Sequence, residues 1–513
     1  MTSSLVPTVM MSCELTDVLC DIERAGIKIN REVLQQLKTD FENEQEELKL
    51  KLRSMAQAAM GDTPINLDSP DDRSMLFYSR KVNNKGVWKT IFNLGTEQRG
   101  ATKKQKMRPR MNQKEFKYAV SDNTTVLRRT IGSQCVECEG KGRVPVIRKD
   151  GSVGKSVRIC RACNGKGMTY VETGQTAGFK ISPRSVKDIA AGGFKTDKET
   201  LEQRLDELSG DAREFVEAYI RYSALRTYLS NFVDGMYNNL DRDGFIHPEF
   251  MQCVTATGRL SSRNPNFQNM PRGSTFVIRK VVESRWDGGK ILEGDYSQLE
   301  FRVAGFLSGD QNIYNDVVAG TDVHSYTASI IGCDRQDAKA HTFKPLYGGV
   351  SGTDAQKRYY NAFKDKYSAV ADWQDENQRQ AVEKGFITLP SGRQYHFPGT
   401  KWTKWGSATN RTAICNYPVQ GFATGDLLPI ALIRLSNLLR ENKMESVICN
   451  TVHDSIVMDV YPGEEHNAIS MMEEAMLSIA EEARERYGID YDMPIDIELK
   501  MGDNWLDTEV VSS

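Results

Sequence analysis

Two aspartates stand where a sheet could bring their carboxylates together. A strand-like run over 290–295 ends at Asp295, and Asp454 lies at the turn between two β-rich runs, 446–452 and 456–460. If these elements share a sheet, the two acids can hold two divalent cations about 3.5–4 Å apart, which stabilises phosphoryl transfer. Mg²⁺ suits such a site because it accepts carboxylate, water and phosphate ligands. Taken singly, each aspartate is more simply explained as a turn or cap residue.

Four of the ten cysteines form two matched CxxC pairs that continue alike, each followed by a Gly-Lys-Gly run. Residues 139–159 separate the two CxxC pairs. Two such pairs at nearly this separation predict one tetrahedral structural Zn²⁺ ion, with a redox pair as the alternative. The predicted zinc ligands are Cys135, Cys138, Cys160 and Cys163. The other six are scattered and are interpreted as reduced thiols of a cytosolic protein: Cys13, Cys20, Cys253, Cys333, Cys415 and Cys449.

Positive charge gathers around these cysteines. From Arg80 to Tyr170 there are 22 lysines and arginines against 6 acids, a local charge of +16, although the whole chain carries only -2. Such a segment is either a phosphate-contacting surface or a solvated arm, and charge alone does not decide between them.

A basic and aromatic series follows the first aspartate. Arg335, Lys339, Phe343 and Tyr347 recur every four residues, so on one helix they would form a slanted stripe. Cations suit the phosphates of a nucleoside triphosphate and rings suit its base. From spacing alone, an ordinary amphipathic helix with a cationic edge is the simpler interpretation.

The elements that must position these residues are predicted from periodicity. Long helices are expected over 31–60, 354–384 and 464–487, helical signals appear over 200–229, and a helix is expected over 297–307 with Ser297 as its N-cap. The chain has no long uninterrupted apolar run and no basic start with an apolar core, so neither a membrane span nor a secretory signal is predicted. A cytoplasmic location is expected.

Several segments together resemble the motifs of family A DNA polymerases, the bacterial polymerase I group. These are GDYSQLEFR at 294–302, VHDS at 452–455, the loop TATGRLSSRNPNFQNMP at 255–271, the Arg335 series, and the ending with Met493-Pro494 and GDNW at 502–505. The resemblance runs from about Leu15 to Trp505, apart from an insertion. Only about a dozen residues precede it, so no amino-terminal nuclease domain is expected.

The resemblance implies a role for each matching residue. Asp295 and Asp454 would hold two Mg²⁺ ions, with the Tyr296 carbonyl as a further ligand, and Glu300 would exclude a ribose 2′-hydroxyl. The incoming nucleotide would contact Tyr296, Gln298, Glu300, His324, Arg335, Lys339, Phe343 and Tyr347. Primer–template DNA would contact Arg259, Asn266, Gln268, Asn269, Arg393, Asn416, Gln420 and His453.

Two departures from the family pattern stand out. Ser455 occupies the place of a usual glutamate, which removes a third carboxylate from the motif. Lys344-Pro345 follows Phe343, and Pro345 is expected to kink the helix because it lacks a backbone N–H. Phe343 itself has no hydroxyl, which by resemblance disfavours chain terminators without a 3′-hydroxyl.

The fold implied is a multidomain α and β right hand with palm, fingers and thumb, and with a small zinc-binding insertion in the thumb. The expected divisions are 12–79, palm start and first thumb part; 80–180, basic insertion with a zinc module at 132–170; 181–240, second thumb part; 241–330, palm; 331–424, fingers; and 425–513, palm. The zinc pairs also resemble half of the cysteine-rich repeat of DnaJ-type chaperones.

The function predicted is template-directed DNA synthesis, in which deoxynucleotides are added to a primer 3′ end by two-metal phosphoryl transfer. The expected setting is phage or mobile-element replication, hence the host cytoplasm, with a processivity factor or a separate exonuclease as possible partners. The alternatives are a repair or gap-filling DNA polymerase, a single-subunit RNA polymerase, and a non-catalytic zinc-dependent DNA-binding or chaperone-like protein. Glu300 and the 255–271 loop argue against the RNA polymerase, and the paired aspartates against the non-catalytic protein.

Overall fold

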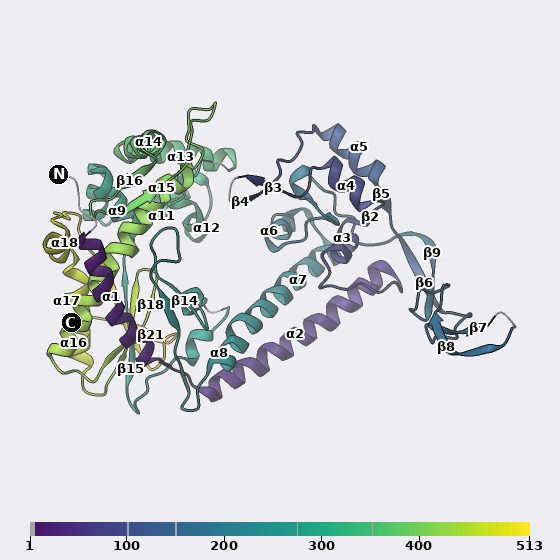
Figure 1. The fold of residues 1–513 in the computed structure, drawn as a ribbon, viewed down its shortest axis with the longest axis horizontal. Helices are drawn as coiled ribbons and strands as arrows, with labels where there is room; N and C mark the ends of the chain where they lie inside the picture. The colour runs from purple at the N-terminus through teal and green to yellow at the C-terminus, as the bar shows by residue number, and fades with distance from the viewer. Residues whose placement is uncertain (1–5, 100–101, 149–150, 274, 351, 513) are drawn as a thin grey trace. The chain divides into compact units, whose positions relative to one another are not determined.

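The computed structural model describes residues 6–99, 102–148, 151–273, 275–350 and 352–512. The chain divides into two compact units: unit 1 comprises 1–38 and 230–513, and unit 2 comprises 39–229 (Figure 1). The six domain divisions expected from the sequence stay predictions. Residues 100–101 of the expected insertion and 149–150 of the expected zinc module lie outside the described residues.

A five-stranded antiparallel sheet forms the centre of unit 1 (Figure 1). Its order is β18 (Val447–Val452), β19 (Ser455–Val460), β15 (Lys290–Tyr296), β20 (Ile497–Gly502) and β21 (Thr508–Val511). β19 is buried along its whole length, which explains its nearly continuous apolar sequence. Helix α17 packs directly on β15 and β20. Gly294 permits this approach, because a Cβ there would lie 2.6 Å from the sulfur of Met476.

α-Helices make up most of the rest of unit 1. They are α1 (Val6–Ala25), α8 (Asp234–Asn239), α9 (Leu299–Ser308), α10 (Gln311–Val318), α11 (Val323–Ile331), α12 (Arg335–Thr342), α13 (Asp354–Lys366), α14 (Ser368–Glu383), α15 (Arg411–Gly421), α16 (Leu428–Glu441), α17 (Glu465–Leu477) and α18 (Ile479–Tyr487). Short strand pairs complete it: β1 (Ile27–Lys28) with β12 (Phe245–Ile246), β13 (Glu249–Met251) with β14 (Ser261–Arg263), and β16 (Phe386–Thr388) with β17 (Gln394–His396).

One helical stretch of unit 1, 411–441, is long and apolar enough to cross a membrane by length and composition alone. Of its most apolar window, 89% is buried inside the structure, as in the core helix of a folded domain.

Two long helices expected in unit 1 are each interrupted. The helix expected over 354–384 breaks at Tyr367, because the Asp310 side chain accepts hydrogen bonds from the N–H groups of Ala369 (3.1 Å) and Val370 (3.4 Å). Asp310, which lies far from α14 in the sequence, thus caps the N-terminus of that helix. The helix expected over 464–487 breaks at Ser478, whose hydroxyl donates to the Ala475 carbonyl (3.0 Å).

Unit 2 contains helices that enclose an aromatic core. The prediction of a helix over 31–60 is confirmed by α2 (Arg31–Met60), which begins in unit 1 and continues into unit 2. The other helices are α3 (Pro70–Tyr78), α4 (Lys85–Ile91), α5 (Gln113–Asn123), α6 (Lys198–Glu202) and α7 (Gly210–Tyr228). The helical signals expected over 200–229 correspond to α6 and α7, which residues 203–209 separate.

The first part of the expected insertion belongs to this core. Trp88 and Phe116 are buried together with Phe194 and Phe215, which lie outside the insertion. Trp88 also donates from its indole N–H to the carbonyl of Ala190 (2.9 Å). Strands β2 (Arg80–Val82) and β5 (Thr124–Val126) pair, as do β3 (Thr96–Arg99) with β4 (Thr102–Gln105) and β10 (Ile189–Ala190) with β11 (Gly193–Phe194).

The cysteine-bearing part has a core of its own. β6 (Arg128–Gln134) pairs with β9 (Met168–Thr176), and β7 (Arg143–Ile147) pairs with β8 (Val153–Ile159). The four cysteines and Val144 form the small buried cluster between these two ribbons. We call residues 128–176 the cysteine arm.

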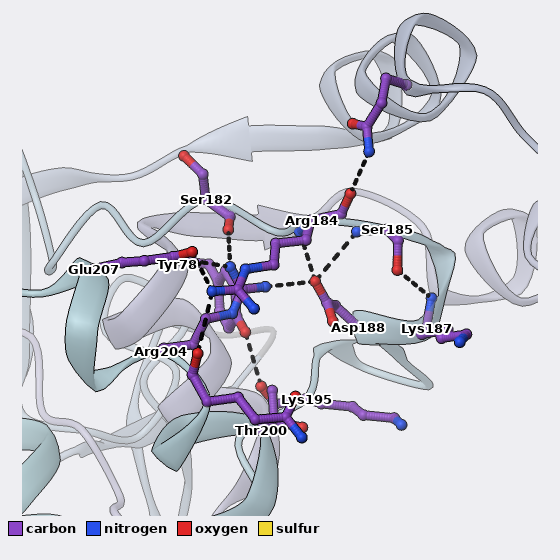
Figure 2. Close-up of polar contacts among 12 residues, drawn as sticks. Tyr78, Ser182, Arg184, Ser185, Lys187, Asp188, Lys195, Thr200, Arg204 and Glu207 are labelled. Atoms are coloured by element: carbon purple, nitrogen blue, oxygen red, sulfur yellow. Dashed lines mark hydrogen bonds and ion pairs between the residues drawn. The ribbon is translucent and has the colours of Figure 1, made fainter. Parts of the chain in front are cut away.

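A buried ionic cluster in unit 2 joins segment 182–188, which follows the cysteine arm, to Arg204 (Figure 2). The Arg204 side chain is only 3% exposed and donates to the Asp188 carboxylate at 2.6 Å and to the Ser182 carbonyl at 3.1 Å. Asp188 also accepts from the backbone N–H groups of Arg184 (2.5 Å) and Ser185 (3.2 Å). The Arg204 charge is thus balanced mainly by the well-satisfied Asp188 carboxylate, with the half-exposed Glu207 carboxylate as a second partner at 3.3 Å.

We expect Asp188→Asn to destabilise the 182–208 region by about 2–4 kcal/mol, since it leaves the buried Arg204 guanidinium with only the half-exposed Glu207 carboxylate as an anionic partner. Hydrogen exchange of the amides in this segment measures the effect locally. Glu207→Gln is the matched control: the Glu207 side chain is 52% exposed, so the loss should stay below about 1 kcal/mol. Equal protection in the two variants would contradict this account of the cluster.

Candidate functional site

Strand register brings the two predicted metal aspartates side by side. β15 and β19 are antiparallel with Asp295 opposite Ser455, and the Tyr296 N–H donates to the Asp454 carbonyl (3.3 Å). His453 takes a positive φ of 58°, which lets the β18–β19 turn close in two residues. Burial, followed by the neighbouring charge of Asp295, raises the pKa of Asp454 to about 7. Two repelling carboxylates at one sheet edge form a donor set that suits Mg²⁺.

Cationic side chains surround this pair. Arg272 donates to the Asp295 carboxylate (3.0 Å), and sequence reasoning missed it although it directly follows the 255–271 loop. Burial, and after it the charges of Arg259, Arg272 and Arg279, lower the pKa of His453 to about 4. His453 is therefore a neutral imidazole at neutral pH.

A third acid, Glu293, lies on β15 two residues before Asp295. It is 8% exposed and accepts from Arg279 (3.3 Å) and from the Ser455 hydroxyl (3.3 Å). Arg279 in turn lies 4.0 Å from the centre of the Trp505 ring. The Ser455 hydroxyl also donates to the Val452 carbonyl (3.0 Å), so the residue that departs from the family pattern is a buried donor shared between Glu293 and the β18–β19 turn.

The segment after β15 differs from its expected start. Ser297 is not the N-cap of α9, because its N–H donates to the Asp496 carbonyl (2.9 Å) and prolongs the strand pairing. Gln298, exposed and in the left-handed region at φ 55°, precedes the helix instead. Tyr296 is buried, and its hydroxyl donates to the Met476 carbonyl (2.8 Å).

Glu300 joins three of the predicted functional segments. It lies in the first turn of α9, and its carboxylate accepts from the Arg259 guanidinium and from the Tyr347 hydroxyl. Arg259 also donates to the Thr424 hydroxyl (3.2 Å). Burial and the Glu300 charge raise the pKa of Tyr347, so this phenol stays a donor. Glu300 is only 15% exposed and has little freedom to move.

The Arg335 series is not one helical stripe. α12 ends at Thr342, Phe343 is its C-cap, and Tyr347 lies in the turns that follow. The expected kink at Pro345 is therefore wrong: the proline comes after the helix has ended, where its missing N–H costs nothing. Arg335 pairs with Asp322 (2.6 Å), and Lys339 is exposed.

The remaining nucleotide residues pack beside α12. Phe343 lies 5.6 Å from the Phe301 ring and 5.4 Å from the His324 ring. The His324 Nδ1 lies 2.9 Å from the Thr342 hydroxyl. The structure thus brings Arg335, His324 and Phe343 to one region of unit 1.

The predicted DNA residues are held by internal contacts. Asn266 accepts from the Gln268 N–H (3.0 Å) and begins the short turn that contains Gln268 and Asn269. Arg393 pairs with the fully buried Asp426 (2.8 Å), a partner that sequence reasoning missed. Gln420 and Asn416 lie on α15, and the Asn416 side-chain oxygen is buried with no partner among the described residues.

The four cysteines converge in the cysteine arm. Their sulfurs all lie within 4.8 Å of one another, with 3.8 Å between Cys135 and Cys160 and 3.6 Å between Cys138 and Cys163. A Zn–S distance of about 2.3 Å implies sulfurs roughly 3.8 Å apart in a tetrahedron, so the donor set fits Zn²⁺. The N–H groups of Gly142 and Gly167 donate to Cys138 and Cys163 at 3.2 Å each.

Comparison with known proteins agrees with this geometry. The family model for DNA polymerase family A matches residues 179–507. DNA polymerase I of Lactococcus lactis is 31% identical over 318 residues, covering 57% of this chain and 35% of that protein. The thermostable DNA polymerase I of Thermus filiformis is 30% identical over 342 residues, covering 61% and 39%. The chain thus spans little more than a third of the length of these relatives.

A solved structure shares the fold. The polymerase domain of Pol1 from M. smegmatis, in complex with DNA primer–template and dNTP, superimposes with a TM-score of 0.65 at 20% identity. The match covers 96% of this chain and 70% of that one. The family model accounts for more than half of the chain and includes both strands that carry the paired aspartates, and the chain therefore belongs to DNA polymerase family A.

Proposed function

We propose that this protein is a template-directed DNA polymerase that adds deoxynucleotides to a primer 3′ end. The observation that carries the proposal is the β15–β19 register, which unites Asp295 and Asp454 at one sheet edge. These carboxylates and the Tyr296 carbonyl would hold two Mg²⁺ ions. When bound, such ions stabilise charge on the attacking and leaving oxygens.

The protein's own groups then bind and orient the substrates. Donors for the triphosphate come from Arg335, Lys339 and His324. The residues that border the nucleotide are Tyr296, Gln298, Phe343 and Tyr347. Glu300 would contact the sugar of the nucleotide. Primer–template DNA is assigned to Arg259, Asn266, Gln268, Asn269, Arg393, Asn416, Gln420 and His453. Arg259 and Arg393 are engaged with carboxylates, so their first contribution is to position the loop and the neighbouring helices.

The biological setting is proposed separately from the reaction. The relatives reported above are bacterial DNA polymerases I, which favours repair or gap filling over the phage or mobile-element replication that the sequence suggested. An RNA polymerase is disfavoured because Glu300, pinned by Arg259 and Tyr347, would occupy the space of a 2′-hydroxyl.

The cysteine arm is proposed as a Zn²⁺-folded module that sustains long synthesis, by holding product duplex or by docking a processivity partner. Its support is the converging sulfurs and the surrounding positive charge. Zn²⁺ would be structural, since four cysteines leave no open position for a substrate.

Asp295→Asn and Asp454→Asn should each lower single-nucleotide addition on the order of 10³-fold or more, because each removes a charged ligand from the metals. Primer–template affinity should stay near normal, as measured by fluorescence anisotropy. Asp503→Asn, which changes an 82% exposed carboxylate, is the control and should stay active. Near-normal turnover of either active-site variant with Mg²⁺ would refute the two-metal assignment.

Glu300→Ala should raise ribonucleotide use relative to deoxynucleotide use by tenfold or more, because the steric barrier to the 2′-hydroxyl is removed. Tyr347→Phe deletes one hydroxyl that holds Glu300 and should relax the ratio less. Single-nucleotide kinetics with both substrates measure the ratio. An unchanged ratio of ribonucleotide to deoxynucleotide use in Glu300→Ala would contradict the assignment of Glu300 to exclusion of the 2′-hydroxyl.

Replacing Cys135 and Cys138 by serine should abolish the bound zinc and expose 128–176 to protease, while single-nucleotide addition is spared. Products made in a single DNA encounter should become shorter. Metal analysis and limited proteolysis test the Zn²⁺ site independently of activity. Cys253→Ser with Cys333→Ser is the matched control, because both thiols lie outside the arm. Equal product lengths, with and without host extract, would reject a role in processivity.

A further inference from the structure

A cavity in unit 2 combines three cationic side chains with no acid in its lining. It has a volume of about 520 Å³ and lies between segment 108–113 and the turn 185–187. Its cations are Arg108, Arg110 and Lys187. Asn112, Gln113 and Ser185 add polar groups, and Pro109, Met111, Phe116 and Val186 complete the walls. None of these residues belongs to the polymerase site described above.

Acids close to the cavity in sequence are already committed elsewhere. Glu115 accepts from the Asn112 N–H (2.9 Å) and completes the cap of α5. Asp188 is held by Arg204 and by the N–H groups of Arg184 and Ser185 (Figure 2). The guanidinium of Arg184 pairs with Glu207. The Asp188 and Glu207 carboxylates are therefore already paired with arginines that do not line the cavity.

The two walls are fixed to one another. The Gln113 side-chain amide donates to the Arg184 carbonyl (3.0 Å), which joins α5 to the segment leading into the 185–187 turn. In the part of the chain that the structure describes, Arg110 and Lys187 form no ion pair, and the Arg108 Nη1 is buried with no acceptor. A buried guanidinium N–H usually has a partner, so the Arg108 Nη1 lacks an acceptor, whereas Arg110 and Lys187 are exposed to solvent.

The surface of α5 carries two lysines and an aromatic ring beside two exposed acids, Glu115 and Asp122, so it has no net charge of its own. Lys114 and Lys117 are exposed on it, and Tyr118 is 72% exposed. Surfaces that bind nucleic acid typically combine cations along the nucleic-acid backbone with an aromatic ring on which bases stack. A free phosphate ion would use the cavity alone, whereas a strand would use both the cavity and the α5 face.

We propose that this cavity binds a backbone phosphate of a nucleic-acid strand and that the α5 face carries the adjoining nucleotides. The site rests on the proposed function, because DNA is then the polyanion that the protein encounters. Arg108 and Arg110 suit phosphate oxygens through their forked N–H donors, and Lys187 adds a point charge. This is a DNA contact additional to those assigned in unit 1.

The test compares two charge-matched double variants of the full chain. Arg110→Gln with Lys187→Gln should weaken primer–template binding about three- to tenfold and reduce the slope of log affinity against log salt by about one to two. Lys81→Gln with Lys89→Gln removes the same charge from exposed positions of β2 and α4 outside the cavity, and should change affinity less than about twofold. Identical behaviour of the two variants would overturn the proposal.

A second arm separates the two sources of phosphate. Amine-reactive labelling of Lys187, read by mass spectrometry, should be suppressed by micromolar primer–template and not by millimolar inorganic phosphate. Equal protection by phosphate alone would overturn the strand assignment. Nucleotide addition from pre-bound DNA should be unchanged in Arg110→Gln with Lys187→Gln. If the unaltered chain binds no DNA, the proposed function fails. If the unaltered chain binds DNA and Arg110→Gln with Lys187→Gln binds it equally well, only the cavity proposal is refuted.

Discussion

The candidate active site depends on the antiparallel pairing of β15 with β19. This register sets Asp295 opposite Ser455, so that Asp454, one residue earlier in the turn, stands beside Asp295. A shift by one residue would send the carboxylate to the other face of the sheet. The pairing holds two acids together although burial, and after it the charge of Asp295, raises the pKa of Asp454. Arg272 offsets part of that charge through its contact with Asp295.

Support for this edge comes from residues that make no contact with a substrate. Gly294 lets α17 pack closely against β15, and the Ser455 hydroxyl binds Glu293, whose charge is balanced by the buried Arg279. In the same way, Arg259 and Tyr347 hold Glu300 from two separate segments. Each arrangement converts a flexible polar side chain into one with a fixed position, as selective substrate binding requires.

Unit 2 combines two kinds of stabilisation. The residues around Trp88 and Phe116 share an apolar core with Phe194. The Arg204–Asp188 cluster fixes segment 182–188, which follows the cysteine arm. The cysteine arm has only a small core of four thiols and Val144, too small for stability by apolar burial alone. A structural metal is a usual means of stabilising so small a unit, and the converging sulfurs would suit it as ligands.

The sequence by itself determined the family, the helix over 31–60, the hairpin that carries Asp454, and the convergence of four cysteines, because each depends on local pattern or fixed spacing. Only the tertiary structure decided where helices break. Asp310 caps α14 from a distant segment, and α12 ends before Pro345 although the four-residue spacing continues to Tyr347. The links of Arg272 to Asp295 and of Arg393 to Asp426 also arise from long-range packing, and periodicity carries no information about contacts between residues far apart in the chain.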